Sequence, residues 1–226
     1  MPRKEAHRGQ KECEAGRGRR SGRCASRCGA KSTDNRRQPI GQSNWRSRRD
    51  ELCGRVDTQT EALFAVTHAH ALAKADHRPE AVREIERART VLSSAKGDDV
   101  PFWALSWGPT AATVHSRSAK VFETLGDRRR AAAMYGAAAS RPPGTYARIV
   151  ALDLVAQAEM QAAEGSIEQA CATWGKAIDH MHGVQSGRTR KAVGSMRRDL
   201  SRFRTRGLRC VAALDERARE FLSSSR

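Results

Sequence analysis

Aromatic side chains are scarce in this chain, since Phe, Trp and Tyr together make up only 5% of its 226 residues. The sequence also lacks any long alternation of apolar and polar residues, which half-buried β-strands require. A protein with few aromatic residues and no strand pattern packs through small side chains on helices rather than around one large central core. These two absences predict an all-α fold.

Long apolar stretches are absent as well. No window is apolar over the length of a membrane-spanning helix, and no apolar region follows the basic start as it does in a secretory signal. The six cysteines do not form the pattern of a disulfide framework. We therefore expect a cytoplasmic protein with no membrane partner.

Catalytic motifs are also missing. The sequence has no Gly-rich phosphate loop, no G-x-S-x-G nucleophile motif and no H-E-x-x-H zinc motif. Nothing in it nominates a nucleophile or a general base. We predict a noncatalytic protein without a cofactor.

The cysteines and histidines give no clear metal site. Cys13, Cys24 and Cys28 crowd the first residues, but only the last two are spaced like zinc ligands, and no second pair follows. His68 and His70 are two residues apart, which places them on different faces of a helix, as is also true of His180 and His182. We predict no metal site, and we expect His68 to face inward. Each of Cys53, Cys171 and Cys210 is expected to act as a small apolar residue within a helix.

Alanine is placed with a spacing that occurs three times: Ala, eleven residues, Ala, three residues, a bulky residue, two residues, Ala. Small residues at these places let two antiparallel helices approach closely, and the bulky residue fills the gap between helix pairs. Gly126 and Gly165 lie five residues before the second alanine, where the first helix needs a C-terminal cap, and Asp76 takes that place in the first copy. We predict antiparallel helix-pair repeats stacked as a short α-solenoid. The three copies are Ala69/Ala81/Ile85/Ala88, Ala119/Ala131/Tyr135/Ala138 and Ala158/Ala170/Trp174/Ala177.

Two segments depart from this regular pattern. An insert at 95–109 holds Phe102, Trp103 and Trp107, which either plug the gap between repeats or form an exposed anchor for a partner. Near the C-terminus, Gly207 and Ala212 repeat the glycine-to-alanine step, but polar residues replace the later motif positions. We interpret this fourth unit as a terminal capping pair whose outer face meets water.

The net charge of +17 is concentrated at the two ends of the chain. Residues 1–50 carry 15 Lys and Arg against 5 Asp and Glu, and residues 187–226 carry 12 against 4. Residues 1–43 are also nearly free of large apolar side chains, so we expect a disordered basic leader there. The rest, 44–226, is expected to form the repeat domain, and its nearly neutral centre suits a binding scaffold with basic flanks.

The motif resembles the tetratricopeptide repeat, which places small and large residues at these positions. From about Leu63 to Leu222 the chain is also similar to the C-terminal region of bacterial helix-turn-helix transcriptional regulators of the xenobiotic-response-element type. That similarity is carried by LFAVTHAHALAKADHRPEAVREIERA, PFWALSWGP, AKVFETLGDRRRAAAMYGAAA, SGRTRKAVGSMRRDLSRF and LDERAREFL. In such regulators the repeats resemble a sensing or oligomerising module. Residues 1–43 contain no helices that could form the DNA-reading domain, so the resemblance implies a regulatory role without it.

The resemblance also implies a ligand groove lined by the first helix of each pair. A protein or an extended or helical peptide suits such a groove, with Lys74 and Lys120 as clamps for a carboxylate. A second copy of the chain, forming a homo-oligomer, or the chain's own terminal helices are the alternative occupants. The groove candidates are Leu63, Val66, His70, Lys74, Ser116, Lys120, Glu123, Leu152, Val155 and Glu159.

A nucleic acid is the competing partner, because the basic ends could hold phosphates without reading sequence. A solvated helix face explains the C-terminal basic segment equally simply. The nucleic-acid candidates are Arg17, Arg19, Arg20, Arg188, Arg190, Arg197 and Arg198.

Overall fold

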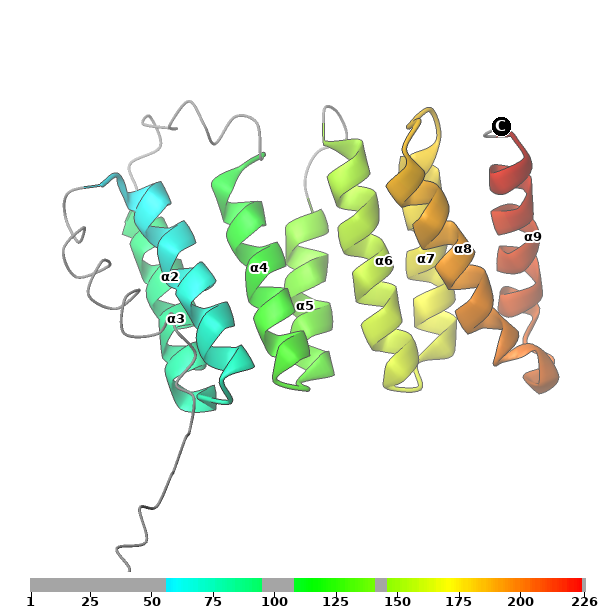
Figure 1. Ribbon diagram of the computed structural model, residues 1–226. Helices are drawn as coiled ribbons and strands as arrows, with labels where there is room; N and C mark the ends of the chain where they lie inside the picture. Colours follow the sequence, from blue (N-terminus) through cyan, green and yellow to red (C-terminus); the bar gives the residue numbers. More distant parts are fainter. Residues whose placement is uncertain (1–55, 95–107, 141–145, 225–226) are drawn as a thin grey trace, which may run out of the picture. The chain divides into compact units, whose positions relative to one another are not determined.

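The computed structural model describes residues 56–94, 108–140 and 146–224, and helices dominate all three segments (Figure 1). No strand occurs within these ranges, which confirms the predicted all-α fold. The helices are α2 (Thr58–Lys74), α3 (Arg78–Ser94), α4 (Thr110–Thr124), α5 (Arg128–Ala139), α6 (Ala147–Ala163), α7 (Ile167–Met181), α8 (Gly187–Ser201), the 3-10 helix η2 (Arg204–Arg206) and α9 (Arg209–Ser224).

The three motif copies coincide with the helix pairs α2/α3, α4/α5 and α6/α7, whose members pack against each other. Every alanine of the motif is fully buried, as small residues must be where two helix backbones approach closely. The bulky positions are buried too, with Ile85 1%, Tyr135 6% and Trp174 0% exposed. The predicted helix-pair repeats are therefore confirmed.

Successive pairs also pack against each other, since α2 contacts α4, α5 contacts α6, and α7 contacts α9. The buried side chains form a series of clusters instead of one centre. Leu72, Ile85 and Tyr135 belong to the cluster of the first two pairs. Trp174 belongs to a separate cluster that draws on α6 to α9 and includes Phe221. This arrangement explains how so few aromatic residues suffice.

Each pair turns through the same local structure at the end of its first helix. Asp76, Gly126 and Gly165 all have positive φ, at 60°, 77° and 89°. The amide that follows each of them donates to a carbonyl five residues back, which is the Schellman pattern that closes a helix. Those bonds are His77 N to Leu72 O at 2.9 Å, Asp127 N to Phe122 O at 2.9 Å and Ser166 N to Gln161 O at 3.0 Å.

These turns allow a matched pair of substitutions with opposite expected signs. Asp76→Gly relieves a left-handed conformation that is costly for a residue with a Cβ, so we expect it to raise the free energy of unfolding by about 0.5 kcal/mol. Gly126→Ala imposes that cost, and a Cβ there would meet no atom within 4 Å, so we expect a loss of about 1 kcal/mol from backbone conformation alone. Urea denaturation followed by circular dichroism measures both. A loss of stability in Asp76→Gly would contradict the argument.

The C-terminal pair, α8 and α9, follows a shifted register. In α9 the buried residues Val211, Asp215 and Ala218 have the spacing of Ala81, Ile85 and Ala88 in α3. Ala212, which the glycine-to-alanine step assigned to the small position, is exposed. The step from Gly207 to the first buried position, Val211, is one residue shorter than the step from glycine to alanine in the other repeats. It is shorter because the chain enters α9 directly after η2, where Val211 N donates to Leu208 O at 3.1 Å. The predicted register was therefore wrong by one residue.

The remaining features of the described helices agree with a capping pair. Glu216 and Arg219 are exposed on the outer side of α9, as the capping interpretation expects.

None of the described helices is long and apolar enough to cross a membrane. The predicted leader at 1–43, the domain boundary at residue 44, Cys53 and the aromatic residues of the 95–109 insert lie outside the residues that the structure describes.

Candidate functional site: a polar face shared by four helices

Charged side chains from four helices lie within electrostatic reach of one another. His70, Lys120 and Glu159 each follow the first alanine of a motif copy, so the helix pairs present them in equivalent rotational positions. The structure brings together five of the ten predicted groove residues and adds one from α8. We call this surface the shared polar face, made of His70 and Lys74 of α2, Lys120 and Glu123 of α4, Glu159 of α6 and Asp199 of α8.

The α2 side of the shared polar face is cationic. Partial burial, followed by the positive charges of Lys74, Lys120 and Arg117, lowers the pKa of His70 below its ordinary value. His70 is therefore neutral at physiological pH. Lys74 is exposed near the end of α2. His68, two residues before His70, is buried as predicted, with 4% exposure.

Glu123 is held in the middle of the face by two groups. The Lys120 ammonium lies 2.6 Å from Glu123 Oε1, and the Tyr135 hydroxyl donates to Glu123 Oε2 at 2.8 Å. Burial, and then the hydrogen bond to Glu123, raise the pKa of Tyr135 and keep its proton in place. Lys120 already pairs with a carboxylate of its own helix, so a ligand carboxylate clamped by Lys120 would compete with Glu123 for the ammonium group.

The α6 and α8 side of the face is anionic. Glu159 is half-buried on α6, and burial, followed by the negative charges of Asp199 and Glu123, raises its pKa. The positive charge of Lys120 offsets part of this effect, and no described residue donates a hydrogen bond to the Glu159 carboxylate. Asp199 Oδ1 lies 3.5 Å from the guanidinium of Arg202, the residue that follows α8. The face thus runs from positive at α2 to negative at α6 and α8.

Three of the four apolar groove candidates lie in the core and not on the shared polar face. Leu63 is 7% exposed and Val66 0%, and both pack with Ala88 and Val114 in one core cluster. Val155 is 5% exposed in the core of the C-terminal pairs. The prediction that these three contact a ligand was wrong, because neighbouring helices cover them. Leu152 is half-buried and remains a candidate.

A buried acid on α6 escaped the sequence-based prediction. Asp153 is 6% exposed, and the Ser116 hydroxyl of α4 donates to Asp153 Oδ1 at 2.7 Å. Ser116 is therefore engaged with the neighbouring pair rather than directed only to a ligand. One signal could have found Asp153: it is the only charged residue in the apolar run IVALDLVAQA.

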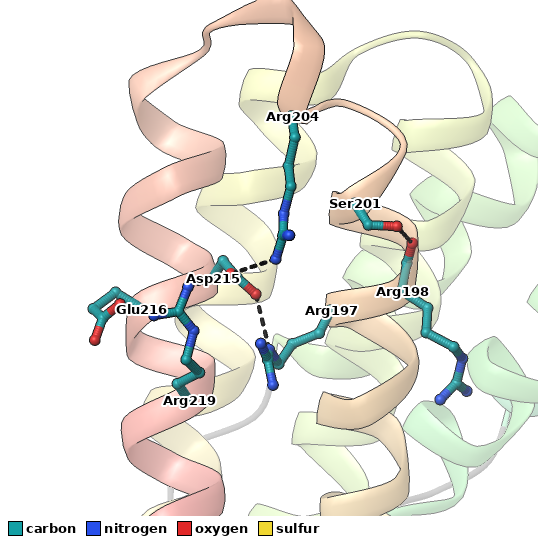
Figure 2. Close-up of polar contacts among 7 residues, drawn as sticks. All are labelled: Arg197, Arg198, Ser201, Arg204, Asp215, Glu216 and Arg219. Atoms are coloured by element: carbon teal, nitrogen blue, oxygen red, sulfur yellow. Dashed lines mark hydrogen bonds and ion pairs between the residues drawn. The ribbon is translucent and has the colours of Figure 1, made fainter.

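The C-terminal arginines divide into two groups. Arg197 of α8 donates to Asp215 Oδ1 at 2.8 Å, while Arg204 and Arg219 each donate to Oδ2 at 2.9 Å (Figure 2). Asp215 itself is buried. We call Asp215 and these three arginines the Asp215 cluster, which joins α8, η2 and α9. The prediction that Arg197 is available to a phosphate is corrected accordingly.

Asp215 owes its ionised state to these arginines. Burial alone would raise its pKa, but the hydrogen bonds of Arg197 and Arg219 and the charges of Arg197 and Arg204 outweigh burial and lower the pKa to about 2. The other group of arginines is exposed on α8 and comprises Arg188, Arg190 and Arg198. Arg17, Arg19 and Arg20 lie outside the described residues.

Within the described part of the chain, no three His, Cys, Asp or Glu side chains are grouped so that they could hold a metal ion. Comparisons with protein-family models, with curated proteins and with solved structures found no match.

Proposed function

We propose that this chain is a noncatalytic repeat scaffold that binds a protein or peptide on the shared polar face. As part of this proposal, it is a regulatory or sensing module of the tetratricopeptide-containing transcriptional regulator lineage and acts in the bacterial cytoplasm. One observation carries the proposal: three helix pairs place His70, Lys120 and Glu159 at equivalent positions on one face. Repeats that present side chains in this way build extended binding surfaces.

The charges of the face suggest the chemistry of the ligand. Glu159 is half-buried, and its pKa is raised by burial and by two other carboxylates, so a cationic ligand group would relieve unfavourable interactions there. Lys74, exposed at the opposite end, suits an anionic group. A peptide with a Lys or Arg side chain over α6 and α8 and a carboxylate near α2 fits this polarity.

Selection from a library of random twelve-residue peptides displayed on phage tests the proposal. We expect the full chain to enrich peptides containing Lys or Arg, because a charge-assisted hydrogen bond to Glu159 adds about 1.5–3 kcal/mol. Glu159→Lys should then weaken the binding of the enriched peptides at least about tenfold, measured by fluorescence anisotropy. Glu220→Lys, an exposed position on α9, is the charge-matched control and should leave binding unchanged.

Two results would contradict the proposal. One is the absence of enrichment from the library. The other is equal binding of the enriched peptides by the wild type and by Glu159→Lys, with both proteins showing the same helicity by circular dichroism.

The exposed arginines of α8 favour a second candidate, a nucleic-acid binder. A titration with a random-sequence DNA duplex at low and at physiological salt separates the two functions, because phosphate contacts weaken steeply as salt rises. If the scaffold proposal is right, DNA binding is weak and disappears at physiological salt. Binding that persists there and is lost in Arg188→Gln/Arg198→Gln would favour the nucleic-acid function.

A further inference from the structure

Two cysteine side chains meet where α7 packs against α9. Cys171 of α7 is 5% exposed, and Cys210, the second residue of α9, is partly buried against the same core cluster. The two thiols lie close enough to interact, because Cys210 contributes to raising the pKa of Cys171. They are far apart in sequence, so only the packing of these two helices makes them neighbours.

Packing alone does not require sulfur at these places. The residues equivalent to Cys171 in the other second helices are Val82 and Ala132, which follow the second alanine of their motif copies. The shared polar face includes neither cysteine. The thiol pair is therefore a chemical feature that neither the repeat pattern nor the proposed function accounts for.

We propose that Cys171 and Cys210 form a redox-sensitive pair, which a small-molecule disulfide such as oxidised glutathione converts into an intramolecular disulfide that links α7 to α9. This inference is independent of the proposed binding function. It assigns a modification site to the C-terminal repeat pair.

The reaction is a two-step thiol–disulfide exchange. Cys210 is the more accessible thiol, and its thiolate attacks one sulfur of oxidised glutathione and releases one glutathione thiolate. Cys171 then loses its proton and attacks the Cys210 sulfur, which forms the Cys171–Cys210 bond and releases the second glutathione. Two protein thiols are oxidised, one glutathione disulfide is reduced to two glutathione molecules, and the protons pass to them.

The burial of Cys171 determines which of the two cysteines attacks first. Burial, and then the neighbouring Cys210, raise the pKa of Cys171 to about 12, so its thiolate is scarce at neutral pH. The first attack therefore belongs to Cys210, and the second step limits the rate. The closed loop contains α8 and η2, so the bond should stabilise the C-terminal pair against unfolding.

The test uses the full chain with Cys13, Cys24, Cys28 and Cys53 replaced by serine, so that only the proposed pair can react. After incubation with oxidised glutathione, we expect peptide mapping by mass spectrometry to find tryptic peptides of α7 and α9 joined by a disulfide. The midpoint of thermal unfolding should rise by about 5 °C and return on reduction. The same chain with Cys210→Ser should show no such rise.

Other outcomes overturn the inference. One is a glutathione adduct that remains on Cys210 without transfer to Cys171. Another is a disulfide that forms only between chains. A third is two thiols that stay reduced when folded although the same chain is oxidised in urea.

Discussion

Trp174→Ala is expected to lower the free energy of unfolding by about 3–5 kcal/mol, the range found when a large buried aromatic side chain is removed from a core. Trp174 is 0% exposed and lies in the cluster that α6, α7, α8 and α9 share. Its loss leaves a cavity at the bulky position between helix pairs. Urea denaturation followed by circular dichroism measures the change.

Trp174→Phe is the matched control for that cavity. The Nε1 of Trp174 is buried without a hydrogen-bond partner among the described residues, so phenylalanine removes an unsatisfied donor while keeping most of the apolar bulk. We expect this variant to lose only about 1–2 kcal/mol. Equal losses in the two variants would show that the indole group, and not the filled volume, stabilises this position.

The effect of Trp174→Ala should also be local. Repeat proteins are stabilised by contacts between neighbouring units, and the Trp174 cluster contains no residue of α2 or α3. Amide hydrogen exchange should therefore speed up in α6 to α9 more than in α2 and α3. A uniform increase along the chain would contradict the separation of the core into clusters.

Asp215→Asn is expected to lower the free energy of unfolding by about 2 kcal/mol at neutral pH. The buried carboxylate accepts hydrogen bonds from Arg197, Arg204 and Arg219, and asparagine removes the charge that holds them (Figure 2). The arginines are partly exposed, so water compensates for some of the loss and the expected effect is moderate.

The pH dependence of this effect follows from the lowered pKa of Asp215. Because the pKa falls from an ordinary value of 3.8 to about 2 on folding, the stabilisation is fully present above about pH 4 and is lost as the pH falls toward 2. The difference in stability between the wild type and Asp215→Asn should therefore vanish over that interval. Urea unfolding curves between pH 6 and pH 2 would reveal it.

Glu216→Gln is the control for Asp215→Asn. Glu216 is the next residue of α9 and also contacts Arg219, at 2.6 Å, but it is exposed. We expect less than about 0.5 kcal/mol from this change. If the two substitutions have similar effects, the Asp215 cluster is an ordinary surface ion pair and not a structural element of the C-terminal pair.

The repeated spacing of alanine and bulky residues predicts the paired helices. The positions of Gly126 and Gly165 predicted the helix ends, and Asp76 was assigned correctly to the equivalent turn. These features depend on backbone conformations and contacts between nearby residues. Such local preferences can be inferred from short stretches of sequence.

The candidate site was predicted only in part. The equivalent positions of His70, Lys120 and Glu159 followed from the resemblance to a known repeat, but Asp199 was missed because α8 does not carry the motif. Leu63, Val66 and Val155 were assigned to the ligand surface because the same resemblance treats their positions as exposed. In this chain neighbouring helices bury all three.

By itself, the sequence determined the fold class, the helix pairs and the turns between them, since each follows from local spacing and from the backbone freedom of single residues. Only the tertiary structure decided the register of α9, the binding of three arginines by Asp215 and the meeting of Cys171 with Cys210. The physical reason is that these features depend on how whole helices are turned and packed against one another, which the spacing of residues within one helix does not determine. A change of one residue in the turn at Gly207 rotates α9 and determines which of its side chains are buried.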